Sequence, residues 1–246
     1  MKKDSCITSP KNSDEKLKSE LVSIVLLCDT PGYRMKSYGA IPLIPFGRQR
    51  LIDIQIQSLK KVFQNFELII CVGYDSEKVC KYIKNKYRQK NIRIVENQKY
   101  ETSNSCEGVR LCLNNINNSR VVICDGSLIV EKGTLNNIVS DKSHVLTESG
   151  FLENLEIGIN VGEHGNIEHF GFGAHRAWSE ILYLSNPDII ESLRRIISSD
   201  NFKQKFLFEG LNELIKTKHK IVAITNKHPV KKINNIKTYH KIRNQI

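Results

Sequence analysis

Residues 121–128, Val-Val-Ile-Cys-Asp-Gly-Ser-Leu, decide how the rest of the chain is interpreted. Four apolar residues in succession are typical of a strand that is covered on both faces, as in a parallel sheet. The strand delivers one carboxylate, Asp125, to the point where a turn begins at Gly126. Ligands of open α/β sheets bind at the carboxyl ends of the strands. Asp125 is therefore the first candidate for a binding residue.

Strand-like and helix-like segments alternate ahead of this stretch. Apolar runs typical of buried strands cover residues 22–28, 67–73 and 92–96. Between them, residues 50–63 and 75–87 carry apolar side chains at helical spacing, and Asn104 can cap a third helix. This order predicts an α/β fold with a mostly parallel, Rossmann-like sheet and helices on both faces.

The pattern changes after residue 140, where short strands are separated by turns that contain glycine. We expect strands at 144–147, 155–161, 166–172, 181–184 and 220–225, and helices at 187–197, 206–218 and 237–243. The second half is therefore predicted to add mixed strands to the sheet. Residues 1–20 are polar and are predicted to form a flexible tail, and residues 21–246 a single domain.

Composition narrows the classes of partner. The chain has 246 residues and a net charge of +11, which favours anionic partners such as nucleotides, nucleic acid or an acidic protein surface. No basic motif interleaved with aromatic residues is present, so nucleic acid is the unlikely partner. No apolar run reaches the ~18 residues of a membrane span. Seven cysteines without Cys-x-x-Cys spacing indicate reduced thiols in a cytoplasmic protein.

The segment between the first strand and the first helix is a second candidate for function. Residues 29–47 form a long loop rich in glycine and proline, and long loops without structure are uncommon in compact domains. Its backbone amides, together with Arg34 and Lys36, could hold a triphosphate. The alternative is a surface loop with ordinary turn chemistry, and the sequence leaves both interpretations open.

The order of these motifs resembles the nucleotidyltransferases that act on sugar phosphates and phospho-alcohols. The superfamily includes cytidylyltransferases for phosphocholine. The resemblance covers about residues 22–243, and the ordered series is more specific than any one motif. It rests on the Arg-Met of the first loop, the strand that ends in Asp-Gly, and the segments 51–56, 97–104, 178–184, 206–215 and 232–239.

The resemblance implies an activity and a set of site residues. The expected reaction transfers a nucleoside monophosphate from a nucleoside triphosphate to a phosphorylated sugar or alcohol, with Mg²⁺ as the cofactor and pyrophosphate as the product. Asp125 and Asn234 would hold the metal ion, and Arg34 and Asp125 would be catalytic. The implied nucleotide-binding residues are Gly32, Arg34, Lys36, Asn97, Tyr100 and Asn104.

Several positions depart from the family pattern. Leu43 stands where the family has a lysine, Ser127 replaces the second acid after Asp125, and Asn234 replaces a late metal-binding acid. Asp29 places a carboxylate where phosphates approach backbone amides. Nearby cations and acids could substitute for the lost groups: Arg34, Lys36, Arg48, Arg50, Glu107 and Asp53.

These losses support a rival hypothesis, because fold does not entail activity. The chain could be an inactive relative that serves as a binding or structural module of a larger protein assembly, such as a virus particle, and would then be located in the virion. A glycosyltransferase with a similar sheet is a weaker third hypothesis, because the second acid is missing. The transferase hypothesis requires that Asp125 face a cavity near the glycine-containing bend at residue 32.

Overall fold

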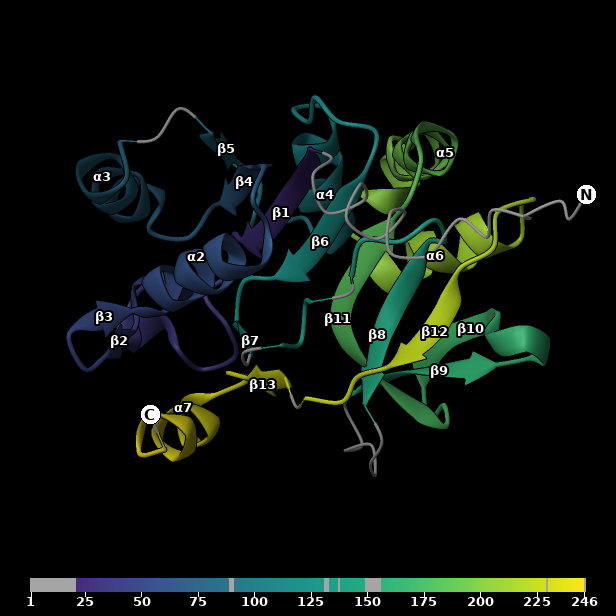
Figure 1. Cartoon of the computed structure of the whole chain (residues 1–246). Helices are drawn as coiled ribbons and strands as arrows, with labels where there is room; N and C mark the ends of the chain where they lie inside the picture. Colours follow the sequence, from purple (N-terminus) through teal and green to yellow (C-terminus); the bar gives the residue numbers. More distant parts are fainter. Residues whose placement is uncertain are drawn as a thin grey trace, which may run out of the picture.

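The computed structural model describes residues 21–88, 91–130, 133–136, 138–148, 156–228 and 230–245, so the polar tail predicted for residues 1–20 lies outside the described residues. Four neighbouring strands of the sheet run parallel in the order β6-β1-β4-β5, and β5 is the edge strand. They are β1 (Val22–Cys28), β4 (Phe66–Val72), β5 (Ile92–Glu96) and β6 (Val121–Asp125) (Figure 1). The mostly parallel sheet expected from the apolar runs is confirmed.

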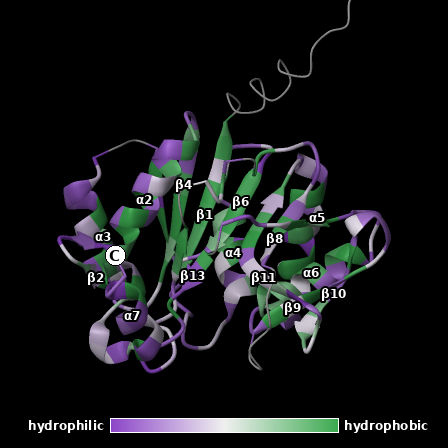
Figure 2. Ribbon diagram, turned by 60° about the horizontal axis from the view of Figure 1, so that its bottom comes forward, coloured by the Kyte–Doolittle hydropathy of each residue, from purple (hydrophilic) through white to green (hydrophobic). Residues whose placement is uncertain are grey.

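Helices cover both faces of this sheet, as predicted. Every residue of β1 and β4 is buried, and successive side chains of a strand point to opposite faces. Ile24 and Leu26 pack in one hydrophobic cluster with α2 (Leu51–Val62) and α3 (Ser76–Lys86). Val25 and Leu27 pack in a second cluster on the other face, and Figure 2 shows the apolar strands enclosed between the helices. The helices of the second face are α4 (Ser105–Leu113), α5 (Pro187–Ile197) and α6 (Leu207–Ile215).

The second half of the chain extends the same sheet with mixed strands. The long strand β11 (Arg176–Leu184) runs antiparallel to β6 and also pairs with β8 and β9. The further strands are β8 (His144–Glu148), β9 (Ile157–Val161), β10 (Ile167–Phe172) and β12 (Val222–Thr225). The strand predicted at 155–161 begins at Ile157 in the structure, and residue 155 lies outside the described residues. The mixed-strand second half is thus confirmed.

Strand β11 begins five residues before the predicted start at residue 181. Its pairing with β8 shifts register between Trp178 and Leu182, and Glu180 has a positive φ of 55° inside the strand. Such a bulge breaks the alternation of side chains on which a strand is recognised in a sequence. The irregularity therefore hid the first half of the strand from the sequence analysis.

The loop at residues 29–47 has more local structure than the sequence indicated. It contains two 3₁₀ turns, η1 (Lys36–Tyr38) and η2 (Ile41–Leu43), and it ends in a short hairpin of β2 (Pro45–Phe46) and β3 (Gln49–Arg50). Part of this loop packs in a third hydrophobic cluster with the end of the chain.

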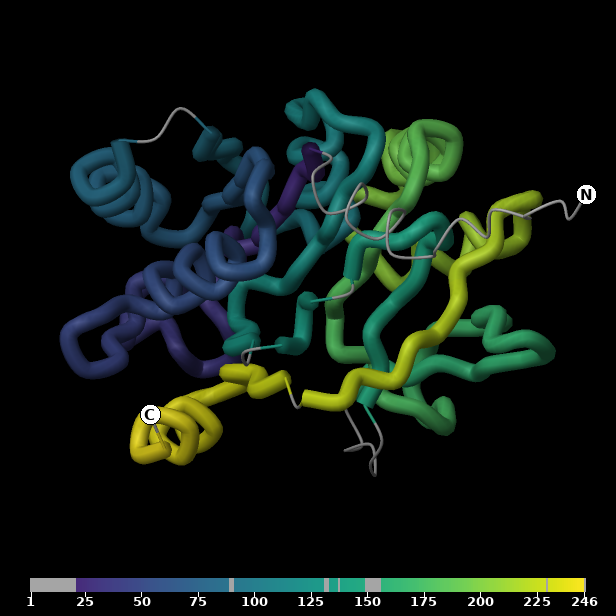
Figure 3. Tube along the Cα trace, viewed as in Figure 1, coloured from purple at the N-terminus to yellow at the C-terminus, as the bar shows by residue number. Residues whose placement is uncertain are grey.

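That C-terminal segment crosses the molecule. After β12 it forms β13 (Val230–Lys232), which pairs antiparallel with β7 (Leu128–Val130), and then α7 (Ile236–Arg243). Figure 3 shows the segment in yellow, running from β12 past β7 to the region of β2 and β3. The crossing brings residues 230–235 beside the turn that follows Asp125. We call this segment, residues 230–243, the C-terminal clasp.

Two further expectations concern the described part of the chain. None of its helices has both the length and the apolar character needed to cross a bilayer. The cysteines that the structure describes are free thiols, as the spacing indicated.

Candidate functional site

A cavity of about 350 Å³ opens where the strand order reverses. Strands β4 and β6 lie on opposite sides of β1, so the connections leave the carboxyl end of the sheet in opposite directions. Asp29 follows β1, and Asp125 ends β6 beside Leu27 of β1. Both carboxylates line the cavity. Asp125 therefore lines a cavity, as the transferase hypothesis requires, but Gly32 is not among the lining residues. We call this space the switch-point cavity.

Three strands bring ionisable side chains together at the floor of this cavity. The pairing of Ile181 with Cys124 places Glu180 of β11 beside Asp125, within hydrogen-bonding reach. The C-terminal clasp supplies Lys232, whose Nζ donates a hydrogen bond to Oε1 of Glu180. We call Asp125, Glu180 and Lys232 the acid–lysine cluster. The sequence analysis missed Glu180 and Lys232, because they meet Asp125 only through strand pairing.

The electrostatics of the cluster keep a cation in the cavity. Burial raises the pKa of Glu180 to about 7, the charge of Asp125 adds to the rise, and Lys232 opposes it. For Lys232, burial by itself would lower the pKa, but Asp125 and Glu180 outweigh it and raise the pKa above the ordinary value. The ammonium group of Lys232 therefore stays charged at neutral pH.

Local contacts fix the position of Asp125. Its Oδ1 accepts hydrogen bonds from the backbone N–H of Ser127, at 2.8 Å, and from the Ser127 hydroxyl. Gly126 lies against β1 so closely that a Cβ there would be 2.4 Å from the carbonyl oxygen of Leu27. The serine that replaces the second acid of the family thus holds the acid that remains.

Asp29 is almost fully buried beside Asn97. Burial raises the pKa of Asp29, and the hydrogen bond from Asn97 Nδ2 to Asp29 Oδ2, at 2.8 Å, opposes the rise. Asn97 Nδ2 also donates to Oγ of Ser103 at 3.0 Å. A raised pKa weakens the repulsion between Asp29 and a phosphate. Asn97, predicted as a nucleotide-binding residue, positions Asp29 in this structure.

The first turn of α4 faces the switch-point cavity. Asn104 caps this helix as predicted, because its Oδ1 accepts a hydrogen bond from the backbone N–H of Ser105 at 2.8 Å. Asn104 and Ser105 both line the cavity. The N–H groups of the first turn already have partners, since Cys106 N–H donates to the Lys205 carbonyl and Glu107 N–H to the Asn104 carbonyl. What the start of the helix offers to a phosphate is its partial positive charge. The nucleotide-binding role of Asn104 stays a prediction.

An aromatic wall lines the same cavity beside the start of α4. It consists of Phe172, Trp178, Phe206 and Phe208. The rings of Phe206 and Phe208 stack at 5.8 Å with an interplanar angle of 18°, and Phe172 meets Phe208 edge to face. Phe172 and Phe206 are 59% and 46% exposed, which is high for phenylalanine. Their clustering at one cavity suits a ligand with an apolar or ring-shaped part.

The basic residues of the first loop do not reach this cavity. Arg34 is exposed, has a φ of +55°, and lies over the ring of Tyr33 at 5.0 Å. Lys36 is exposed, and neither of the two lines the switch-point cavity. Gly32 shapes the loop, since it has a φ of +74° and a Cβ there would lie 2.5 Å from Ile41 Cδ1.

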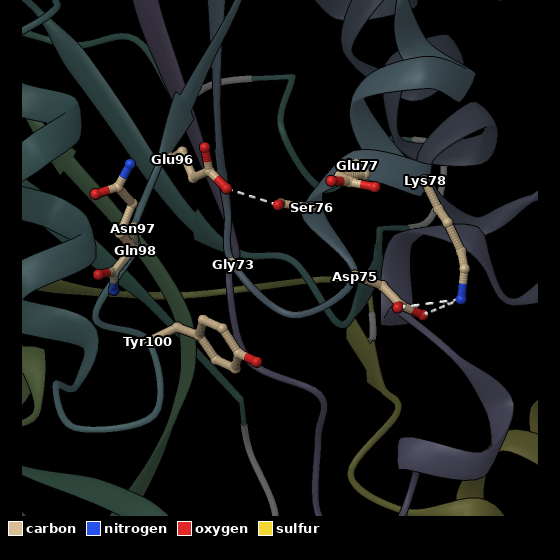
Figure 4. Close-up of a pocket in the computed structure, with 9 residues that line it drawn as sticks. All are labelled: Gly73, Asp75, Ser76, Glu77, Lys78, Glu96, Asn97, Gln98 and Tyr100. Atoms are coloured by element: carbon tan, nitrogen blue, oxygen red, sulfur yellow. Dashed lines mark hydrogen bonds and ion pairs between the residues drawn. The ribbon is translucent and has the colours of Figure 1, made fainter.

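A second hollow, of about 450 Å³, holds Tyr100 and one side of Asn97 (Figure 4). The charged residues that line this hollow are mostly acidic. Lys78 forms an ion pair with Asp75 at 3.0 Å, and the Ser76 hydroxyl donates a hydrogen bond to Glu96 at 2.6 Å. Such a lining disfavours phosphate. The structure therefore separates the predicted nucleotide-binding residues, because Asn104 lies at the switch-point cavity and Tyr100 at this acidic hollow.

The comparisons with known proteins agree with this architecture. A family model described as a domain of unknown function (DUF6564) matches residues 48–151. No curated protein matches the chain. The CTP:phosphocholine cytidylyltransferase of Streptococcus pneumoniae superposes with a TM-score of 0.77 at 20% identity, over 91% of this chain and 98% of that chain. The chain has the nucleotidyltransferase fold.

Other solved nucleotidyltransferases match almost as well. The inositol-1-phosphate CTP transferase of T. maritima has a TM-score of 0.72 at 16% identity, over 90% of this chain and 93% of that chain. A UDP-glucose pyrophosphorylase solved with UDP-glucose has a TM-score of 0.70 at 15% identity, with coverage of 92% and 98%. The recognition of this superfamily from the ordered motifs is thus confirmed at the level of the fold.

Within this nucleotidyltransferase fold, none of the six residues considered as substitutes lines the switch-point cavity. Leu43 lines a third hollow, beside Arg50 and α3, and Arg50 Nη1 donates to the Leu43 carbonyl at 3.0 Å. Glu107 is held by Arg110 through two hydrogen bonds of 2.7 Å. Among the described residues that line the switch-point cavity, Lys232 is the only cation.

The carboxylate and amide oxygens at the cavity are poorly suited to bind a divalent metal ion. Asp125 Oδ1 is already bound twice by Ser127, and Glu180 is paired with Lys232. Asn234 offers a neutral amide, which lacks the charge that Mg²⁺ prefers, and it does not line the cavity. In the described part of the chain no group of three histidine, cysteine, aspartate or glutamate side chains could hold a metal. The dependence on Mg²⁺ stays a prediction.

Proposed function

We propose that the chain binds a nucleoside triphosphate and a phosphorylated small molecule in the switch-point cavity and transfers the nucleotide between them. One observation carries the proposal. In a nucleotidyltransferase fold, the charged Lys232 and the N-terminus of α4 converge on a cavity at the carboxyl ends of β1 and β6. Both features attract phosphate, and the cavity lies where ligands of α/β sheets bind.

The reaction needs little covalent participation from the protein. A phosphate oxygen of the acceptor attacks the α-phosphorus in line, the bond from that phosphorus to the oxygen bridging it to the β-phosphate breaks, and pyrophosphate leaves with the electron pair. The acceptor oxygen is already anionic, so no general base is required. Positioning and stabilisation of charge supply the catalysis in such transfers. Lys232 and the partial positive charge at the start of α4 are available for this stabilisation.

The aromatic wall is the proposed site of the acceptor. Phe172, Phe206 and Phe208 offer apolar surface to a carbon skeleton, and Lys232 in the same cavity offers charge to its phosphate. The solved neighbours are named for acceptors as different as phosphocholine and inositol-1-phosphate. The acceptor of this chain therefore has to be identified by testing such phosphorylated alcohols and sugars.

A second candidate function is binding without turnover. The position at which the resemblance expects a lysine, Leu43, lines a different hollow, and Arg34 and Lys36 lie outside the cavity. Removing one charge-stabilising group typically costs 10²–10³ in rate, roughly 3–4 kcal/mol. A chain with a single cation at the cavity could therefore bind nucleotide and transfer it slowly or not at all. A role in a larger assembly stays a prediction.

Thermal stability in the presence of ligands tests both candidates. Purified protein is heated with CTP, UTP, ATP and GTP in turn, with and without Mg²⁺, and pyrophosphate release is then followed with phosphocholine, inositol-1-phosphate and glucose-1-phosphate. A nucleotide at ~100 times its dissociation constant should add ~2.7 kcal/mol of stability. Stabilisation with pyrophosphate release supports the transferase. Stabilisation without release supports the binding module, and the absence of stabilisation by every nucleotide contradicts both.

A further inference from the structure

The acid–lysine cluster contains its own cation at the place where the fold would otherwise need an external one. Asp125 and Glu180 lie side by side, and two adjacent carboxylates disfavour each other's charge. Lys232 relieves this repulsion through its ion pair with Glu180 and its interaction with Asp125. A divalent ion that entered between the acids would have to displace a covalently attached ammonium group.

Strand pairing fixes this arrangement. Lys232 lies opposite Leu128 in the β13–β7 pair, and the next residue, Ile233, donates its backbone N–H to the Ser127 carbonyl at 3.1 Å. The side chain of Ile233 is buried in the third hydrophobic cluster, so alternation along the strand sends Lys232 to the opposite side. The pairing of β13 with β7 thus directs the side chain of Lys232 to the cavity.

We propose that Lys232 is the built-in cation of the switch-point cavity and binds the phosphate of the ligand directly, without a divalent metal ion. The inference deepens the proposed function, and it rests on that function only for the statement that the ligand carries phosphate. The ammonium supplies one of the two positive charges that a divalent ion would bring. Lys232 can turn from Glu180 to a phosphate oxygen while the carboxylates remain beside it.

The test is a titration that follows Trp178. This residue is the single tryptophan of the chain and lines the cavity, where it is 8% exposed, so its fluorescence reports on binding. Wild-type protein is titrated with each nucleoside triphosphate and with inorganic pyrophosphate, once in EDTA and once in excess Mg²⁺. We expect saturable binding in EDTA, with an affinity that changes less than about tenfold when Mg²⁺ is added.

The variant Lys232→Met keeps the length of the side chain and removes its charge. In EDTA it should bind roughly 10- to 100-fold more weakly, the effect of losing one charge-assisted hydrogen bond. Mg²⁺ should then restore part of the affinity, because Asp125 and Glu180 have lost their cation. Lys232→Arg should retain binding in EDTA. Lys216→Met is the matched control, since it removes the same charge from a surface ion pair with Glu213 on α6.

A second variant covers the case in which Lys232→Met does not fold. Lys232→Met with Glu180→Gln removes both members of the ion pair, leaves no buried charge from it, and should also lose binding in EDTA. Wild-type binding only in Mg²⁺ overturns the inference and leaves the proposed function standing. Pyrophosphate binding in EDTA without binding of any nucleotide supports the inference and contradicts the proposed function. Unchanged affinity of Lys232→Met, or no binding of any probe, also overturns the inference.

Discussion

Asp53 is a fully buried carboxylate that joins two helices. Its Oδ2 accepts hydrogen bonds from Tyr82 and Lys86, both at 2.7 Å, its Oδ1 accepts one from Tyr87 at 2.6 Å, and the Arg50 amide binds it at 2.8 Å. Burial alone would raise the pKa of Asp53, but these hydrogen bonds outweigh it and hold the pKa below the ordinary value. This residue was considered as a substitute acid, and the structure gives it a structural role.

Asp53→Asn should therefore lower the free energy of unfolding at neutral pH by ~2 kcal/mol, since hydrogen bonds to a charged group are lost. A carboxylate with a depressed pKa stabilises the fold above its unfolded pKa and loses that contribution as the pH falls. The difference between wild type and variant should shrink below pH ~4, the ordinary range of the aspartate pKa. Urea unfolding over a pH series measures it, and a difference independent of pH would contradict this account.

Strand β11 contains backbone strain at the residue that completes the acid–lysine cluster. Glu180 has a φ of +55°, a region that costs a residue with a side chain about 1–2 kcal/mol and costs glycine little. The variants Glu180→Ala and Glu180→Gly both lack the carboxylate, so the difference between their free energies of unfolding isolates the backbone strain. The bulge directs the carboxylate of Glu180 to Asp125 and Lys232.

Glu180→Gly should accordingly be more stable than Glu180→Ala by ~1 kcal/mol, the reverse of the order in an ordinary strand. Chemical denaturation of the two variants in parallel measures the difference. Val145→Ala and Val145→Gly in the neighbouring β8, which is buried and regular, form the matched pair. If Ala is the more stable residue at both positions, the strand is not strained at Glu180.

The C-terminal clasp connects distant parts of the molecule and positions the cavity's cation. Tyr239 of α7 is 1% exposed, packs edge to face against Phe46 at 5.5 Å, and donates its hydroxyl to the Pro45 carbonyl at 2.8 Å. The first loop is thereby fastened to the segment that carries Lys232. Loosening this contact should affect the fold and the site together.

Tyr239→Ala should lower the free energy of unfolding by ~3–5 kcal/mol through the cavity it leaves. Tyr239→Phe removes only a hydrogen bond and should cost ~1 kcal/mol. Thermal unfolding with and without nucleotide is the measurement, and the Ala variant should also lose part of the stabilisation by nucleotide because β13 is less firmly placed. Equal effects of the two substitutions would show that the ring packing contributes little.

Much of the fold was readable from local patterns, because a strand buried on both faces needs an unbroken apolar run and a covering helix needs apolar residues at helical spacing. The runs at β1, β4 and β6 and the cap at Asn104 are of this kind. Asp125 was found for the same reason, since the end of a buried strand marks the edge of the sheet. The short pairs β2–β3 and β7–β13 were missed because two- and three-residue strands leave no period in a sequence.

The sequence by itself determined the order of the longer strands and helices, the carboxylate at the end of β6 and the losses at Leu43 and Ser127. Tertiary structure alone decided that Glu180 and Lys232 join Asp125, whereas Arg34 and Lys36 stay outside the cavity. The physical reason is that contacts between residues 52 or more positions apart, as in the Glu180–Lys232 pair, depend on strand register and on the path of the clasp. Strand register and the path of the clasp cannot be recognised from the residues of any single segment of the chain.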